Sequence, residues 1–325
     1  MENKVKWGIL GTANVAAWGM IPGMKKASDT ELVAIAGRDP GKTKRYSDQF
    51  GIRKTYLSYD ELINDSEISA VYIPLPNDLH MPWVIKALKS GKHVLCEKPL
   101  ALSSDEVKKM FLTAQECGVY LMEAYAYLHS PYVESLKKDI QSGIIGDIDY
   151  IDTAFVTQGY KDDFRLRKEP GGGAMYDLGC YCTTMILSLI DSGIKTVNAV
   201  SEFSDLGVDL LTTGYIGFQN GARASFNVGM ILGEDTNSRY DRLYIHGTKG
   251  SIRSDVEYNM EGLLRYKIFT EDGEIERAVE ADNNYSLEIE QFNRCIKGYE
   301  TPHVSSDFSI RNAELIDTVL KKIGY

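Results

Sequence analysis

A lysine stands at residue 98, directly after an apolar run at residues 93–96 that is typical of a β-strand. Proline cannot donate a hydrogen bond to a sheet, and it restricts the residue before it to extended or turn conformations. Because Pro99 follows it, we expect Lys98 on a stiff turn at the carboxyl end of a strand. Ligands bind at that edge of an open α/β sheet, so Lys98, with Glu97 beside it, is a candidate ligand contact.

A second candidate group lies between Arg165 and Tyr181, where three consecutive glycines precede Ala-Met-Tyr-Asp-Leu-Gly-Cys-Tyr. Glycines let a backbone approach a ligand closely, and a helix would bring Asp177 and Tyr181, four residues apart, to one face. An ammonium such as Lys98 stabilises a phenolate, so Lys98 and Tyr181 would form an acid–base pair near neutral pH. The alternative is structural, because the chain has 20 tyrosines and this spacing also fits a solvated edge beside a core residue.

The composition is that of an ordinary globular protein, with 325 residues, 43% hydrophobic and 25% charged, and this length suggests two domains. A net charge of -10 argues against a nucleic-acid or anionic-membrane surface, so we expect small molecules as partners. Residues 1–10 lack a signal-peptide pattern, and we expect a cytoplasmic location. Five scattered cysteines indicate reduced thiols; Cys180 and Cys182 have no second pair or nearby histidine, so no metal site is expected.

The first third of the chain alternates strand-like and helix-like segments, which predicts right-handed βαβ units and a parallel doubly wound sheet, that is, a Rossmann fold. We expect strands at residues 4–10, 31–36, 70–73, 93–96 and 119–123, and helices at residues 16–27, 40–50, 82–89 and 104–117.

From about residue 150 the pattern changes to consecutive strands, which predicts a large, mostly antiparallel sheet in an α/β domain. We expect strands at residues 150–158, 196–203, 211–218, 222–230 and 242–246, and a helix at residues 174–190. The expected domains are therefore residues 1–124 and 125–325, with an amphipathic helix at residues 306–323 that would pack back on the first domain.

The turn after the first strand has the spacing of a dinucleotide-binding fingerprint, in the register GxAxxA. The middle glycine is replaced by alanine, so the motif alone is weak; the strand before it and the helix after it support it. The amides at the start of the helix would face a pyrophosphate. The residues expected there are Gly11, Thr12, Ala13, Asn14 and Val15.

The end of the second strand is expected to select the cofactor. Gly37 precedes Arg38, whose guanidinium suits a 2′-phosphate and can stack on adenine, and Lys42 lies one turn beyond. These residues favour NADP(H) over NAD(H). Asp39 leaves NAD(H) possible, and the plainer interpretation is a surface arginine paired with Asp39.

The loop after the third strand is stiffened by two prolines, and Asn77 within it could give amide contacts to a ribose or a nicotinamide. The same loop is equally consistent with a strand exit whose Asn77 and His80 only cap the next helix. The residues expected at the cofactor are Pro74, Leu75, Pro76, Asn77 and His80.

Taken together, these motifs resemble the glucose-fructose oxidoreductase / inositol dehydrogenase / MocA (Gfo/Idh/MocA) family, in the family's order and over nearly the whole chain. The motifs are the GxAxxA turn, the loop at 73–77 with His80, Glu97-Lys98-Pro99, Glu123-Ala124 and GGGAMYDLGCY. The match looks closest to the branch of dihydrodiol dehydrogenase, NADP-dependent xylose dehydrogenase and glucose-fructose oxidoreductase. In that branch a tyrosine replaces the histidine of inositol dehydrogenases, and Tyr181 occupies this position.

The resemblance implies that the open sheet of the second domain packs against another subunit, so we expect a homo-oligomer, in the first place a dimer. It also implies that Lys98 contacts the nicotinamide ribose and the substrate hydroxyl, that Tyr181 is the acid–base residue and that Asp177 orients substrate or tyrosine. Glu97, Glu123 and Arg165 are expected at the cofactor.

Two departures from the family pattern stand out. Ala13 replaces a glycine, and residues 128–129 are Leu-His where arginine–histidine or arginine–phenylalanine is usual, which leaves the substrate open.

The expected reaction is reversible hydride transfer between nicotinamide and a sugar or related diol, at a secondary carbinol or the anomeric carbon of an aldose. A keto-sugar or anhydro-sugar reductase would use the same residues in the opposite direction. A cyclitol substrate is disfavoured because Tyr181 is not histidine. A third alternative is a non-catalytic NADP-binding sensor with a protein partner; the presence of both Lys98 and Tyr181 favours an enzyme.

Overall fold

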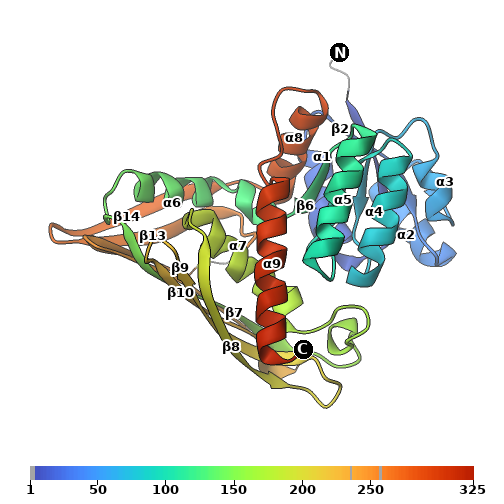
Figure 1. Cartoon of the computed structure of the whole chain (residues 1–325). Coiled ribbons are helices and arrows are strands. Elements are labelled where there is room, and N and C mark those ends of the chain that lie inside the picture. Colours follow the sequence, from blue (N-terminus) through green and yellow to red (C-terminus); the bar gives the residue numbers. More distant parts are fainter. Residues whose placement is uncertain (1–3, 235, 256–257) are drawn as a thin grey trace. The chain divides into compact units, whose positions relative to one another are not determined.

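The computed structural model describes residues 4–234, 236–255 and 258–325 (Figure 1). The chain forms two compact units: unit 1 comprises Met1–His129 and Asp282–Ile310, and unit 2 comprises Ser130–Ala281 and Arg311–Tyr325. The return to unit 1 brings in α8 (Asn284–Ile296), a helix that the sequence reading did not predict. The functional division at residues 124 and 125 stays a prediction.

Unit 1 is built on a six-stranded parallel sheet in the order β3-β2-β1-β4-β5-β6, which confirms the predicted doubly wound fold. Except for the short edge strand β3, its strands are mostly buried and apolar, as expected of a parallel sheet covered by helices on both faces. The strand order reverses between β1 and β4, where such sheets bind ligands at their carboxyl ends. The strands are β1 (Val5–Leu10), β2 (Thr30–Ala36), β3 (Lys54–Tyr56), β4 (Ala70–Ile73), β5 (His93–Glu97) and β6 (Leu121–Ala124).

The longer helices of unit 1 follow the predicted alternation. The short elements β3, α3 (Tyr59–Ile63), η2 (Asn77–Leu79) and η3 (Ala126–His129) were not predicted, because three to five residues carry too little periodicity. The remaining helices are η1 (Ala16–Met20), α1 (Ile21–Lys26), α2 (Pro40–Phe50), α4 (His80–Lys89) and α5 (Ser104–Cys117). Figure 1 shows α4 and α5 side by side against the sheet.

Buried hydrogen bonds fix α8 to the first two strands of the sheet. The indole nitrogen of Trp7 donates to the Asn293 side chain at 3.0 Å. The Asn293 amide in turn donates to Asp29 at 2.8 Å and to the Thr30 hydroxyl at 2.7 Å. The buried indole donor of Trp7 and the amide of Asn293 are therefore both hydrogen-bonded where the helix returns to unit 1.

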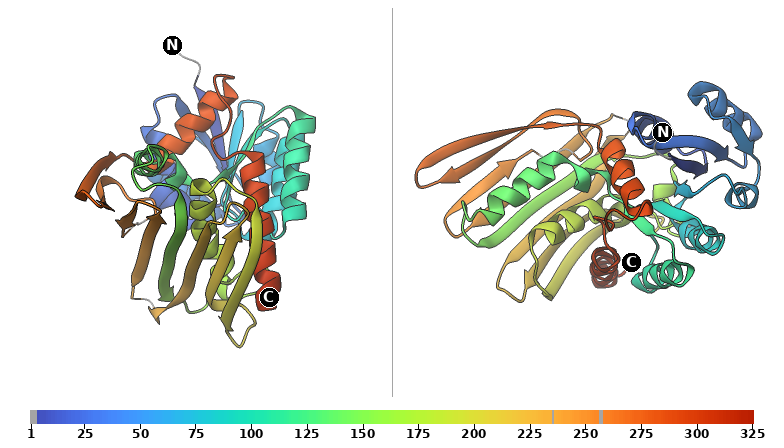
Figure 2. Two further views of the ribbon diagram at one scale, coloured as in Figure 1. Left: turned by 60° about the vertical axis from the view of Figure 1, so that its left-hand side comes forward. Right: turned by 90° about the horizontal axis from the view of Figure 1, so that it is seen from above.

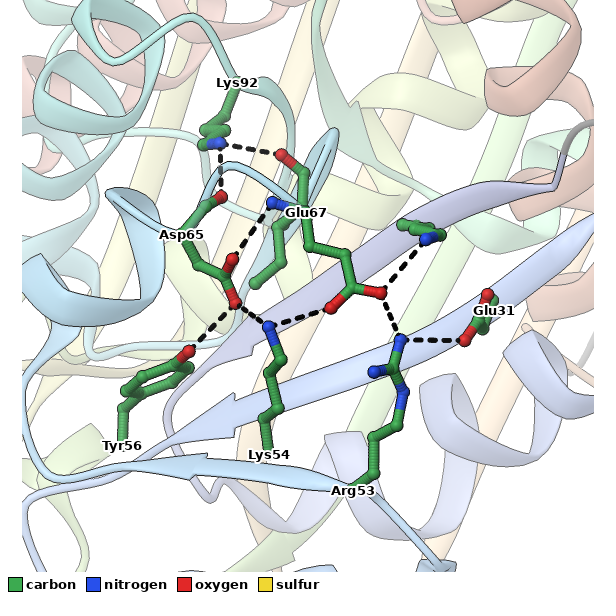
Figure 3. A network of polar contacts seen from close by, with 9 residues as sticks. Glu31, Arg53, Lys54, Tyr56, Asp65, Glu67 and Lys92 are labelled. Carbon is green, nitrogen blue, oxygen red and sulfur yellow. Dashed lines mark hydrogen bonds and ion pairs between the residues drawn. The ribbon is translucent and has the colours of Figure 1, made fainter.

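A charged network closes the amino-terminal edge of the same sheet (Figure 3). Asp65 accepts hydrogen bonds from Lys54 at 2.6 Å and from Tyr56 at 2.8 Å. Glu67 pairs with Lys54 and Arg53, and hydrogen bonding from Arg53 is the main reason why the pKa of Glu67 falls well below its usual range. Because ligands bind at the opposite edge, we assign this network a structural role.

Unit 2 is built on an eight-stranded sheet in the order β14-β13-β12-β11-β7-β10-β9-β8. Only β7 and β10 pair in parallel, so the predicted mostly antiparallel sheet is confirmed. The last three strands were not predicted. The strands are β7 (Ile148–Gly159), β8 (Ile194–Phe203), β9 (Asp209–Phe218), β10 (Arg223–Glu234), β11 (Arg239–Gly247), β12 (Gly250–Ser254), β13 (Gly262–Thr270) and β14 (Gly273–Ala281).

One face of this sheet is covered by α6 (Pro131–Gln141), the π-helical turn η5 (Met175–Gly179) and α7 (Cys180–Leu189) (Figure 2). Inward side chains such as Phe226 are fully buried, whereas Tyr215 and Tyr240 on the other face are 39% and 46% exposed. No helix of the described residues covers that outer face. Across the same described ranges, no helix has the length and apolarity needed to cross a membrane.

Candidate active site

The turn after β1 has the backbone that a dinucleotide-binding loop requires. Gly11 has φ +117°, a conformation that side-chain-bearing residues rarely adopt, and a Cβ there would lie 3.0 Å from Leu75 Cδ2. The chain is helical from Asn14 onward, and the hydroxyl of Tyr46 donates to the Ala13 carbonyl at 3.2 Å. The amides at the start of this helix are therefore held at the carboxyl end of β1.

The end of β2 is tightly joined to this turn. A Cβ on Gly37 would lie 2.3 Å from Thr43 Oγ1 and 3.0 Å from Thr12 Cγ2, so only glycine fits between them. The Arg38 side chain is exposed at this edge, with the partly exposed Lys42 four residues later.

Asp39 caps α2 at this edge of the sheet. Its Oδ1 accepts the amide hydrogen of Lys42 at 3.0 Å, and this bond is the main reason why the pKa of Asp39 is lowered. Among the described residues it forms no ion pair with Arg38, so the plainer interpretation of a paired arginine is not supported. The guanidinium of Arg38 instead lies near the Tyr59 hydroxyl.

His80 connects the loop after β4 to the lysine turn after β5. Its Nε2 lies 2.7 Å from the Leu75 carbonyl oxygen and its Nδ1 lies 2.9 Å from the Pro99 carbonyl oxygen. The side chain is fully buried, and burial lowers its pKa, so the ring is neutral at pH 7 and donates to one of the two carbonyls. His80 thus positions two loops, while its predicted contact with a cofactor stays a prediction.

Lys98 stands on the turn that follows β5, as predicted from Pro99. Its side chain is partly buried, and its backbone amide lies 3.3 Å from Glu97 Oε2. Glu97 also accepts a hydrogen bond from the hydroxyl of the fully buried Tyr72 on β4. The acidic neighbour of the lysine is therefore held in place by the next strand of the sheet.

Glu123, at the end of β6, lies behind this lysine turn. It is 3% exposed and accepts the amide hydrogen of Leu100 at 2.9 Å. Burial raises its pKa to about 7, a rise that the hydroxyls of Ser309 and Tyr125 and the positive charge of Lys98 oppose. A carboxyl whose pKa is raised toward neutrality therefore lies beside the lysine turn.

Glu288 on α8 is a buried acid that the sequence reading missed. It is fully buried, and burial followed by the negative charge of Glu97 raises its pKa well above the usual value. Its Oε1 lies 3.9 Å from His129 Nε2. The sequence did contain a signal for the burial of this acid. Glu288 follows Tyr285 by three residues and precedes Phe292 by four, so it lies on the same helical face as these two buried side chains.

In unit 2 the three glycines serve the fold of their own loop. A Cβ on Gly172 would lie 2.4 Å from the carbonyl oxygens of Arg165 and Arg167, and one on Gly173 would lie 2.1 Å from Asp209 Oδ1. Gly172 and Gly173 permit a close approach of the chain to itself, and the predicted approach of this loop to a ligand stays a prediction. The loop is thereby folded back so that Arg165 is presented to the following helix.

Arg165 and Asp177 form a partly buried ion pair with Arg165 Nε 2.7 Å from Asp177 Oδ2. The charge of Asp177 is the main cause that raises the pKa of Arg165, which also donates to Asp163 at 3.1 Å. The guanidinium lies over the ring of Phe164, 4.8 Å from its centroid. The sequence reading named both residues but did not predict that they pair.

Tyr181, at the start of α7, is partly exposed and packs in an aromatic cluster. Its ring centroid is 5.4 Å from that of Phe155 and 5.0 Å from that of Tyr258. Asp177, four residues earlier, lies in the π-helical turn η5, a feature that is frequent at functional sites. The cluster fixes the ring and leaves part of the side chain accessible.

The structure thus groups the predicted residues in two sets. One set lies at the carboxyl edge of the unit 1 sheet and comprises the Gly11 turn, the Arg38 edge, the proline loop and the Lys98 turn with Glu123. The other set lies in unit 2 and comprises Arg165, Asp177 and Tyr181.

Comparisons with known proteins agree with this arrangement. Residues 5–125 match the family model described as "Oxidoreductase family, NAD-binding Rossmann fold", and residues 133–253 match the "GFO/IDH/MocA C-terminal domain".

Among curated relatives, D-xylose 1-dehydrogenase (NADP(+)) 2 of Haloferax volcanii is 31% identical over 96% of this chain and 95% of its own. The trans-1,2-dihydrobenzene-1,2-diol dehydrogenase of Xenopus tropicalis is 30% identical over 98% of both chains. Among solved structures, a 3-ketoreductase from Actinomadura kijaniata in complex with NADP and TDP-benzene has a TM-score of 0.92, with 27% identity over 99% of this chain and 98% of the other.

The raised pKa of Glu123 predicts how stability depends on pH. Between about pH 4.5 and 7 the folded chain keeps a proton on this carboxyl that the unfolded chain has lost, so stability is lost as the pH rises through this range. Glu123→Gln keeps an acceptor for the Leu100 amide and cannot ionise. Its free energy of unfolding, measured by urea denaturation, is expected to fall less from pH 5 to pH 8 than that of the native protein. The exposed Glu116→Gln is the control; parallel pH profiles for all three proteins would contradict the assignment.

Proposed function

Because the chain belongs to the Gfo/Idh/MocA oxidoreductase family, we propose that it is an NADP(H)-dependent enzyme acting on a sugar or a related diol. The relatives are named as dehydrogenases and reductases of such substrates. The proposed reaction is the reversible oxidation, by hydride transfer, of a secondary carbinol or of the anomeric carbon of an aldose.

The carboxyl edge of unit 1 fits a dinucleotide. The positive φ of Gly11 and the helix that begins at Asn14 suit a pyrophosphate, and the exposed guanidinium of Arg38 suits a 2′-phosphate, with Lys42 beside it. Thr12, Ala13 and Val15 would complete the phosphate turn. When bound, the cofactor would supply the nicotinamide carbon that gives or takes a hydride.

One observation carries the proposal: the phosphate turn and the lysine turn are coupled through a short chain of contacts. The Gly11 position touches Leu75, the Leu75 carbonyl meets His80, and His80 meets the Pro99 carbonyl. His80 therefore links the turn that carries Lys98, through Leu75, to the Gly11 turn that would hold the pyrophosphate. Asn77, Glu97 and Glu123 lie at or just after the carboxyl ends of β4, β5 and β6 and are proposed to contact or position the nicotinamide half.

In unit 2, Tyr181 is proposed as the group that takes the proton from a substrate hydroxyl or returns it. Lys98 would stabilise the oxygen as negative charge develops, and it would favour the phenolate form of Tyr181. Asp177 is held by Arg165 at 2.7 Å, so its carboxylate is a fixed acceptor suited to orient a second hydroxyl of the substrate. A polyol is the substrate class that this fixed carboxylate would recognise.

A second candidate function is reduction of a keto sugar. The 3-ketoreductase from Actinomadura kijaniata matches 99% of this chain at a TM-score of 0.92. Reduction would use the same groups, with Tyr181 donating the proton to the new alkoxide. The ratio of kcat/KM for aldose or diol oxidation with NADP+ to kcat/KM for keto-sugar reduction with NADPH distinguishes the two candidates.

We also propose that the chain forms a homodimer through the outer face of the unit 2 sheet. Tyr215 and Tyr240 are exposed on this face, and Arg242 is paired there with Asp152 at 2.7 Å and lies over the Tyr240 ring. Exposed aromatic side chains next to arginine are typical of interface cores.

The catalytic assignment predicts large losses of turnover. Lys98→Ala and Tyr181→Phe are each expected to lower kcat by about 10²- to 10⁴-fold on the best sugar or diol of a substrate panel. Tyr181→Phe is expected to leave NADPH binding, measured by fluorescence, unchanged. Tyr299→Phe, at a side chain that is 74% exposed, is the control and should keep native turnover. Near-native turnover of both catalytic variants would overturn the assignment.

The cofactor assignment predicts a selective effect at the end of β2. Arg38→Ala removes a charge-assisted hydrogen bond to the 2′-phosphate and is expected to weaken NADPH binding by about 10- to 100-fold while NADH binding stays the same. Parallel fluorescence titrations at one ionic strength measure both. The exposed Arg45→Ala serves as the matched charge control; equal weakening of NADH and NADPH by Arg38→Ala would rule out this role.

The dimer proposal predicts the mass of two chains in sedimentation velocity at micromolar concentration. Tyr240→Glu places a charge in the proposed interface and should shift the mass toward a single chain. Leu57→Glu, at a side chain of unit 1 that is 59% exposed, should not. A native protein that sediments as one chain would contradict the proposal.

A further inference from the structure

Unit 2 carries a groove whose lining includes none of the residues proposed for catalysis. It is a groove of about 750 Å³ between β8 and α9 (Ser306–Ile323), which lie beside each other in Figure 2. One wall is formed by residues 193–198, and the other by Arg311, Glu314, Leu315, Thr318 and Lys322. This volume lies in the range of specific ligand sites.

The first wall is the free edge of a sheet. β8 is the outermost strand, and within the described part of the chain it pairs only with β9. Six consecutive residues line the groove, so the backbone itself faces it and not only alternate side chains. Every second residue of an edge strand presents an N–H and a C=O that another strand can bind.

The second wall is one face of a helix that runs alongside the strand. Its lining residues are spaced by three, one, three and four, which is a single stripe. From Arg311 to Lys322 the helix rises by about 16 Å, and residues 193–198 extend over about 16 Å of strand. The two walls therefore have the same length, which equals that of about five residues of extended chain.

The charges of the groove differ in sign from those of the whole chain. The lining holds three cations, Lys195, Arg311 and Lys322, and one acid, Glu314, in a protein with a net charge of -10. Asp191, which is outside the lining, lies 3.8 Å from Arg311. The guanidinium of Arg311 is fixed by donating to the carbonyl oxygens of Ile190 and Ser192. Within the described ranges, Lys195 and Lys322 have no ion-pair partner, and both are exposed.

The floor of the groove is apolar. Leu315 is 1% exposed and Val197 is 8% exposed, and both belong to the lining. The groove has cations at its rim, an apolar floor and a free strand edge, and these match an extended peptide with acidic and apolar side chains. When a peptide adds to a strand edge, main-chain hydrogen bonds supply affinity and alternate side chains supply specificity.

We propose that the groove between β8 and α9 binds an extended acidic segment of a partner protein as an added strand next to β8. The segment is about five residues long, with carboxylates toward Lys195 and Lys322 and an apolar side chain over Leu315. The oxidoreductase would then bind its partner protein through a surface that contains none of the residues proposed for its reaction.

The experiment uses the full chain and a fluorescein-labelled, acetylated and amidated peptide, Gly-Glu-Val-Glu-Val-Glu-Gly, in fluorescence anisotropy titrations. Saturable binding that weakens with salt is expected, together with slowed amide hydrogen exchange at residues 193–198. The double variant Lys195→Glu, Lys322→Glu is expected to weaken binding at least tenfold. Lys321→Glu changes the neighbouring charge outside the groove and should bind like the native protein.

Two further probes separate strand addition from simple charge attraction. A peptide with N-methyl groups on alternate amides keeps its charge but cannot pair with β8, and it is expected not to bind. A peptide with lysine in place of glutamate is also expected not to bind. The proposal is overturned by absence of binding up to 1 mM, by equal binding of the N-methylated peptide, or by equal effects of the groove variant and Lys321→Glu. A loss of mass of the groove variant in sedimentation would also overturn it, since a second copy would then occupy the groove.

Discussion

The geometry of unit 1 depends on one buried imidazole placed between two carbonyl oxygens. His80 holds the Leu75 and Pro99 carbonyls at 2.7 and 2.9 Å, and these carbonyls belong to loops that leave neighbouring parallel strands. Loops at the carboxyl edge have no ladder of their own, so their relative position must come from side chains. Leu75 also lies against the Gly11 turn, where a Cβ would come within 3.0 Å of Leu75 Cδ2, so one buried residue links the phosphate turn and the lysine turn.

Three carboxyl groups, Glu97, Glu123 and Glu288, bear on that lysine turn, and the two buried ones, Glu123 and Glu288, would be costly as isolated charges. The structure handles them in different ways. Glu97 accepts a hydrogen bond from Tyr72, Glu123 accepts one from the Leu100 amide, and burial followed by the negative charge of Glu97 raises the pKa of Glu288. The positive charge of Lys98 in turn opposes the rise that burial causes in the pKa of Glu123, so the lysine and this acid influence each other's charge.

The sequence predicted the elements of unit 1 well because long buried strands and amphipathic helices have clear periods; α2 and α5 were predicted at their observed bounds. It failed where the signal depends on partners distant in the chain. The helix α8 and the acid Glu288 belong to unit 1 only through contacts such as that of Trp7 with Asn293. Local sequence spacing also could not predict the role of the three glycines, because the atoms that would clash with a Cβ belong to residues outside the glycine run, such as Arg165 and Asp209.

The two sheets also show why net charge is a poor guide to partners. A chain with a charge of -10 gathers exposed cations in two places, Arg38 with Lys42 at the end of β2, and Lys195 with Lys322 beside β8. Screening confines the influence of a charge to about 8–10 Å at moderate salt, so a ligand senses the nearby groups and not the total. What each site selects then follows from its backbone. Helix amides at a glycine turn suit a phosphate, and a free strand edge suits another strand.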